Sequence, residues 1–161
     1  MTVITRANSP YKVSSGVTDN GDVVSSGGSM YVLSGGAVVQ TTVEAGGLLT
    51  VSKGGFEEIT ILSGAETQRG LGEDSFIYSG GRMTVAAGGT EVIPRISAGG
   101  VLDVLAGGVV LGDVNSTLNS GRLETTASGG RIVSSTIDNS GEIAALGTDT
   151  ESLHHQHDYC R

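Results

Sequence analysis

The sequence feature that most constrains the fold is a glycine pair that recurs at fixed spacing. From Gly27 to Gly47 the chain reads GGSMYVLSGGAVVQTTVEAGG, and from Gly80 to Gly100 it reads GGRMTVAAGGTEVIPRISAGG. Both stretches separate their glycine pairs by six and then nine residues. Glycine pairs, or Ser-Gly and Asn-Gly in their place, recur along most of the chain with a period of about 19 residues. A period of this size is typical of a solenoid.

The segments between the glycine pairs have the pattern of β-strands. Met30 and Val32 flank Tyr31, and Met83 and Val85 flank Thr84, so apolar residues alternate with variable ones. Period-2 alternation places the apolar side chains on one face of a strand. In the longer segments a Thr precedes an aliphatic residue, as in Thr42-Val43 and Thr60-Ile61. A unit of this length cannot bury its own apolar face, so we predict an all-β parallel β-helix of about six or seven stacked rungs.

Composition excludes several classes of partner. The 161 residues include 27 Gly and no Trp, and the formal net charge is −8. Nucleic acid and anionic membrane surfaces both require clustered basic residues, so we expect neither as a partner. No apolar run reaches the length of a membrane span, so we expect no membrane insertion. Because the start of the chain lacks the layout of a signal peptide, an exported protein of this sequence is expected to be part of a longer chain or to use another export route.

Breaks in the repeat divide the chain into three predicted parts. We expect an N-terminal cap over residues 1–12, a β-helix over 13–147 and a flexible tail over 148–161. Within the β-helix, residues 65–78 contain no glycine pair and are predicted to form an irregular loop. This loop either lengthens one rung or projects from the rod to make contacts.

No catalytic or metal-binding arrangement emerges from the sequence. The acidic residues are scattered, and Glu73 and Asp74 near Arg69 form the only local cluster, which is more typical of a solvated loop than of an acid–base pair. The tail carries His154, His155, His157, Asp158 and Cys160, but a flexible tail lacks the rigid support that a built metal site needs. We therefore predict a non-enzyme that uses no cofactor and no metal.

The repeat resembles a known family. The pattern of a glycine pair, an alternating strand, a second pair and a Thr-aliphatic strand is similar to the passenger repeats of self-associating autotransporter adhesins of the AIDA and antigen 43 type, over about residues 13 to 143. The resemblance implies a right-handed parallel β-helix exposed on a Gram-negative cell surface, with a role in adhesion, cell–cell aggregation and biofilm formation. Some family members are glycosylated on Ser and Thr, and this chain offers hydroxyls at Ser14, Ser15, Ser25 and Ser26.

Three interpretations of function remain open at this point. The first is a non-catalytic surface stalk or adhesin fragment that binds copies of itself, another protein, a cell surface or glycans. The second is a carbohydrate-binding or tailspike-like β-helix, and the third is an assembly module that docks its rung edge on a larger partner. For a contact surface the expected residues are Tyr31, Gln40, Glu44, Lys53, Glu57, Glu66, Arg69, Glu73, Asp74, Phe76 and Tyr78.

Overall fold

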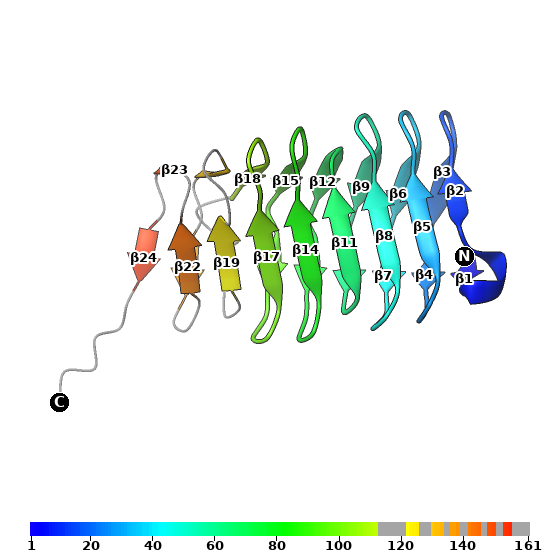
Figure 1. Cartoon of the computed structure of the whole chain (residues 1–161), viewed down its shortest axis with the longest axis horizontal. Coiled ribbons are helices and arrows are strands. Elements are labelled where there is room, and N and C mark those ends of the chain that lie inside the picture. The colour runs from blue at the N-terminus through cyan, green and yellow to red at the C-terminus, as the bar shows by residue number, and fades with distance from the viewer. Residues whose placement is uncertain are drawn as a thin grey trace.

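The chain forms a rod of stacked β-strand rungs. The computed structural model describes residues 1–112, 122–125, 130–133, 136–138, 142–145, 148–150 and 153–155. Figure 1 shows strands from successive rungs lying side by side along the rod, with the N-terminus at the blue end. The predicted all-β parallel β-helix is confirmed.

Three parallel sheets, here called A, B and C, run along the rod. Sheet A contains, in order, β1 (Val3–Ile4), β4 (Val23–Val24), β7 (Thr42–Val43), β10 (Ile61–Leu62), β13 (Phe76–Ile77) and β16 (Arg95–Ile96). Sheet B contains β2 (Tyr11–Val13), β5 (Ser29–Val32), β8 (Leu48–Val51), β11 (Ala65–Gln68), β14 (Arg82–Val85), β17 (Val101–Val104), β19 (Arg122–Thr125) and β22 (Glu142–Ala145). Sheet C contains β3 (Thr18–Asn20), β6 (Ala37–Val39), β9 (Phe56–Glu58), β12 (Leu71–Glu73), β15 (Thr90–Val92), β18 (Val109–Leu111), β20 (Arg131–Val133) and β23 (Thr148–Thr150). A further parallel pair joins β21 (Thr136–Asp138) to β24 (Leu153–His155).

The core is a column of aliphatic side chains enclosed by the three sheets. Met30 and Val32 are fully buried, while Tyr31 between them is half-buried on the outer face of sheet B. Each buried residue stacks on its register partner in the next rung, as Met30 does on Leu49. The alternation read from the sequence therefore sets which side chains enter the core.

Glycine pairs form the turns on either side of sheet B. The two glycines of a pair meet different structural requirements. Gly35 has a φ of 75°, a left-handed conformation that side chains resist. A Cβ on Gly36 would lie 2.5 Å from the carbonyl oxygen of Val13 in the preceding rung. The first glycine of the pair is thus selected by backbone conformation and the second by close packing between rungs.

In the described rungs, the third corner, between sheets C and A, does not use a glycine pair. Gln40, Ile59, Asp74 and Ile93 hold this corner with φ values of 56° to 58°. The residue after each of them is buried, and Thr41 and Thr60 take this inward position. The shared Thr-aliphatic pattern of Thr42-Val43 and Thr60-Ile61 does not mark equivalent positions. Thr42 pairs with Ile61 in the ladder, so the two patterns are offset by one residue.

The expected irregular loop over residues 65–78 is instead part of the regular ladder. Strands β11, β12 and β13 occupy most of it and pair in parallel with the rungs on both sides. Phe56 pairs with Leu71, fifteen residues on, whereas Ala37 pairs with Phe56, nineteen residues on. We call residues 61–75 the short rung. Its turns, 63–64 and 69–70, have two residues each, which is why the glycine-pair spacing lapses there without a loop.

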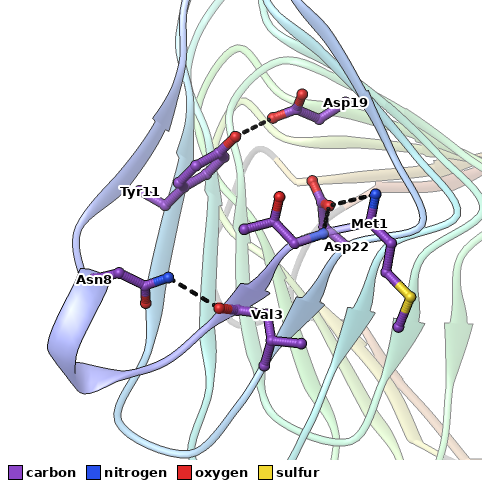
Figure 2. Close-up of polar contacts among 7 residues, drawn as sticks. Met1, Val3, Asn8, Tyr11, Asp19 and Asp22 are labelled. Atoms are coloured by element: carbon purple, nitrogen blue, oxygen red, sulfur yellow. Dashed lines mark hydrogen bonds and ion pairs between the residues drawn. The ribbon is translucent and has the colours of Figure 1, made fainter.

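A short helical turn lies at the start of the first rung, within the predicted cap (Figure 2). A short 3₁₀ helix, η1 (Arg6–Asn8), is held by Asn8, whose side-chain amide donates to the Val3 carbonyl at 2.9 Å. The Tyr11 hydroxyl donates to Asp19 at 2.8 Å, and this hydrogen bond raises the pKa of the Tyr11 hydroxyl. Within the region predicted as a cap, β1 already belongs to sheet A.

At the other end, the prediction of a flexible tail over 148–161 was wrong for two segments. Residues 148–150 form β23 and residues 153–155 form β24, both paired in parallel with earlier strands. The expectations for His157, Asp158 and Cys160 lie outside the described residues. In the described part of the chain, no helix has the length and apolar character that crossing a membrane requires.

Candidate functional site: a corner patch and a buried acidic cluster

The predicted contact residues separate into outward and inward groups. Tyr31, Phe76 and Glu73 lie on the outer faces of sheets B, A and C, Gln40 and Asp74 hold the corner between sheets C and A, and Glu44, Lys53, Arg69 and Tyr78 lie on turns. Glu57 and Glu66 are 0% and 2% exposed and point into the core. The prediction that these two glutamates face outward was wrong, and Glu58 takes the outward position beside Glu57.

One group of outward residues is in mutual contact. The Arg95 guanidinium lies 3.5 Å from a carboxylate oxygen of Asp74 and 4.7 Å from the centroid of the Phe76 ring. Phe76 pairs in the ladder with Ile61, which is 40% exposed. We call Ile61, Asp74, Phe76 and Arg95 the corner patch. It combines an apolar surface with opposite charges, a composition suited to protein contacts.

The short rung leaves a groove on the edge of the rod where sheets A and B meet. The turns before and after it have four residues, so the two-residue turn at Ser63–Gly64 lies recessed between them and leaves a volume of about 510 Å³. The groove is lined mostly by small residues, with Arg82 at one side. Its small lining residues include Gly46, Gly47, Ser63, Gly64 and Gly80. Elsewhere the turn glycines donate along the rod, as the Gly27 amide does to the Gly46 carbonyl at 2.8 Å. Among the described residues, no such backbone bond links the Gly46 amide to the short rung.

An unusual core lies within the short rung and the two rungs that flank it. Glu57 from β9, Glu66 from β11 and Glu91 from β15 are all buried, together with Gln68 from β11. In sheet C, Gly72 pairs with Glu57 on one side and with Glu91 on the other. A Cβ on Gly72 would come within 2.5 Å of an Nε2 or Oε atom of Gln68, Glu57 and Glu91. The missing side chain at residue 72 therefore provides the space into which these three side chains point.

Two of the three carboxyls lack hydrogen-bond partners. Glu57 accepts from the hydroxyls of Thr60 and Ser75, the latter at 2.8 Å. Both carboxyl oxygens of Glu66, both of Glu91 and the Nε2 of Gln68 have no hydrogen bond of normal geometry. The ion pairs among the described residues all lie elsewhere. A buried carboxyl group that has no basic side chain beside it is more stable as the neutral carboxylic acid than as the carboxylate.

The pKa values of the three carboxyls follow from this environment. Burial raises the pKa of Glu57 to about 7, and the hydrogen bonds from Thr60 and Ser75 oppose the rise. Burial and then the charge of Glu57 raise the pKa values of Glu66 and Glu91 well above their usual range. Ser75 and Gln68 lie near enough to Glu91 to oppose this rise, although neither makes a normal hydrogen bond with it. The three groups titrate as one coupled system.

The chemistry open to this cluster is proton uptake and release. In the part of the chain that the structure describes, no group of three or more His, Cys, Asp or Glu side chains is arranged to hold a metal ion. The carboxyls are almost fully enclosed, so a substrate on the surface does not reach them. We call Glu57, Glu66, Glu91 and Gln68 the acidic cluster.

A sequence signal for the acidic cluster existed in the repeat alignment. Glu57 stands two residues after Gly55, as the buried Val38 stands two residues after Gly36. Glu66 takes the ladder position of Leu49 and Met83, but this position becomes visible only when the short rung is recognised as a rung.

Comparison with known proteins supports the fold. No family model and no curated protein sequence matches the chain. A solved structure, that of a TibC-catalysed hyper-glycosylated TibA fragment, is similar with a TM-score of 0.64 and 22% sequence identity. The match covers 94% of this chain and 70% of that one.

Proposed function

We propose that this chain is a non-catalytic segment of a surface-exposed adhesive rod that associates with copies of itself. The corner patch is the observation that carries the proposal, because it places an exposed aliphatic residue, an aromatic ring and paired charges on one outer edge of a rigid scaffold. The passenger-repeat pattern of the sequence and the fold shared with the TibA fragment support it.

Repetition supplies the affinity that one small patch lacks. Aligned rods bring several weak contacts together, and the second contact then forms at high effective concentration. On the outer face of sheet B, Thr50, Thr67 and Thr84 stack in register and offer a repeated polar row to another rod, a cell-surface protein or a glycan. Localisation at a cell surface, outside a Gram-negative bacterium, belongs to the same proposal.

The test is light scattering over a range of concentrations, combined with clustering of beads coated with the protein. The patch variant carries Ile61→Ser with Phe76→Ser, and the matched control carries Thr50→Ser with Thr84→Ser on sheet B. All four side chains point outward, so both variants are expected to fold. We expect the patch variant to weaken association at least threefold and the control to retain it. A monomer at every concentration, with no bead clustering, would overturn the proposal.

A second candidate function is that of a glycan carrier, which the hyper-glycosylated state of the TibA fragment favours. Exposed serines on the turns are Ser15, Ser26, Ser34 and Ser79. Each lies beside the first glycine of the corresponding turn in the next rung. Coexpression with a glycosyltransferase of the TibC type and intact-mass measurement test this role. Added sugar masses on the turn serines support it, and an unmodified mass counts against it.

Assembly through the rung edge receives less support at the N-terminal end. There β1 is the end strand of sheet A, and the Asn8 side chain already donates to its Val3 carbonyl. A backbone group that is already hydrogen-bonded is not available for pairing with a partner strand.

A further inference from the structure

We propose that the acidic cluster makes the short rung a pH-operated joint of the rod, closed while its carboxyls hold protons and open once they release them. The joint lies between the rungs that precede residue 56 and those that follow residue 92. This inference goes beyond the proposed adhesive function and does not depend on it.

The first step of the argument is the weak apolar core of the short rung. In a regular rung, sheet B contributes two aliphatic side chains to the interior, as Met30 and Val32 do. The short rung places Glu66 and Gln68 at those positions, and sheet C contributes Gly72 where Val38 stands two rungs earlier. Its inward aliphatic contribution comes from Leu62 of sheet A. Less buried apolar area means less stabilisation of this rung by the hydrophobic effect.

The second step is the absence of compensation for charge. The groups that face the cluster are Thr60 and Ser75 from the corner between sheets C and A, Gln68 from β11, and the three glutamates themselves. Glu58 and Glu73 lie nearby on the outer face and add negative charge. Among the described residues, no Lys, Arg or His forms an ion pair with Glu57, Glu66 or Glu91. A carboxylate formed here has no cation to stabilise it.

The third step is the position of the Gln68 amide. Its Nε2 is buried and unpaired, and it points at the same vacant space beside Gly72 as oxygens of Glu57 and Glu91. One amide offers only two hydrogens, and two hydroxyls already serve Glu57. The closed rung therefore satisfies one carboxylate through hydroxyl donors, while the remaining carboxyls require protons.

The fourth step is the architecture of a solenoid. Each rung contacts only its two neighbours, so its stability is set locally. When protons leave to solvent, the mutual repulsion of the carboxylates and their loss of hydration are relieved by separating the rungs around residue 72. Farther along the rod, Val38, Val110 and Leu49 take the ladder positions of Glu57, Glu91 and Glu66, so these rungs stay closed. The expected result is local opening rather than unfolding of the whole rod.

Hydrogen exchange of the full chain tests the joint. Exchange is followed at pH 5 and pH 8, with labelling times scaled to the intrinsic exchange rate so that only the opening equilibrium is compared. We expect the opening constant of the amides in residues 56–92 to rise at least tenfold, since one unit of pKa shift corresponds to a factor of ten. The amides of β5 and β17 serve as the internal reference and are expected to change less than threefold.

Two variants identify the groups. Glu66→Gln with Glu91→Gln keeps the shape of both side chains and removes their charge, so the rise between pH 5 and pH 8 is expected to be smaller than in the unmodified chain, with the rest coming from Glu57. Glu44→Gln, on an exposed turn, is expected to keep the full rise. An equal rise in the double variant and the unmodified chain would overturn the proposal, as would a rise spread evenly along the rod.

Infrared spectroscopy of the unmodified chain gives a second readout that does not depend on a variant folding. Exposed carboxyls are ionised at pH 6. The carbonyl band of protonated carboxylic acids is therefore expected to persist at pH 6 and to weaken as the pH is raised further, and its absence at pH 6 would overturn the proposal. Adding calcium chloride at pH 8 is expected to leave exchange unchanged. Restored protection would show that a metal ion, rather than protons, closes the joint.

Discussion

At the scale of single residues, Gly72 has a role that differs from that of the turn glycines. It lies in the middle of β12 and provides space for Glu57, Gln68 and Glu91. Gly72→Ala is expected to lower the free energy of unfolding by about 1–3 kcal/mol, because the added methyl group overpacks the interior. Urea denaturation measures the change.

The matched variant for this prediction is Gly72→Ala combined with Glu91→Ala. Truncation of Glu91 removes one of the atoms that the new Cβ would contact. The double variant is expected to lose less stability than the sum of the two single variants, which a double-mutant cycle detects. Simple additivity of the two losses would contradict the assignment of Gly72 as the space-providing residue.

Ile59 also shows a conflict between residue type and backbone. It adopts a φ of 58°, which costs a non-glycine residue about 1–2 kcal/mol and is disfavoured further by a β-branched side chain. Asn tolerates this conformation, so Ile59→Asn is expected to raise the free energy of unfolding by about 1 kcal/mol. The change is measured by thermal or urea unfolding. Ile61→Asn, in the extended strand β10, is the control and is expected to give no gain; equal effects at both sites would contradict the strain argument.

At the scale of elements, the two-residue turn at Ser63–Gly64 explains the groove. Inserting Gly-Gly after Ser63 would make this turn as long as turns 44–47 and 78–81. We expect the new turn to accept a hydrogen bond from the Gly46 amide and to slow its hydrogen exchange at least tenfold, as measured by NMR. The same insertion into turn 33–36 is the control. There the neighbouring turns leave no gap, so no amide is expected to gain protection.

The cap is the second element with a testable role. Deleting residues 1–9 removes β1 and η1 and exposes the outer edge of β4. An exposed edge pairs readily with another chain, so the truncated protein is expected to form larger species at lower concentration in light scattering. Adding the patch substitutions Ile61→Ser and Phe76→Ser separates this edge pairing from association through the corner patch. A truncated protein that associates no more than the full chain would show that the cap does not protect the edge.

At the scale of the whole molecule, the acidic cluster sets how stability depends on pH. A carboxyl whose pKa is raised on folding stabilises the fold below its unfolded pKa, and this contribution is lost as pH rises to the folded pKa. For Glu57 the window runs from 4.5 to about 7. Urea unfolding at a series of pH values is expected to show a loss of up to about 3 kcal/mol across this window.

The control for this prediction is the variant with Glu66→Gln and Glu91→Gln, whose stability is expected to vary less with pH. Measurements at physiological ionic strength limit the contribution of the net charge of −8, which acts in the same direction. Stability that rises between pH 4.5 and pH 7 in the unmodified chain would contradict the assignment.

The sequence by itself determined the architecture. The spacing of pairs such as Gly35–Gly36 and the alternation of Met30, Tyr31 and Val32 require stacked strands with tight turns, because no single unit can bury its apolar face. The outward position of Tyr31 was also predictable from this alternation. These features depend on local backbone preferences and on the period of the pattern, both of which are written in the sequence.

Only the tertiary structure decided the register of the short rung and the faces of its side chains. The two turns of residues 61–75 are each two residues shorter than usual, so this rung does not follow the 19-residue period. For that reason Glu66 was predicted to face outward, and a loop was expected at 65–78. Glu57 faces inward although Phe56 beside it is more apolar, because pairing with Val38 in β6 fixes which residues of β9 point to the core. Ladder pairing links every strand to its neighbours, and a shift of one residue would reverse all the side chains of a strand. That collective constraint outweighs the polarity of any one residue, and it is why three carboxyls lie at the centre of the rod.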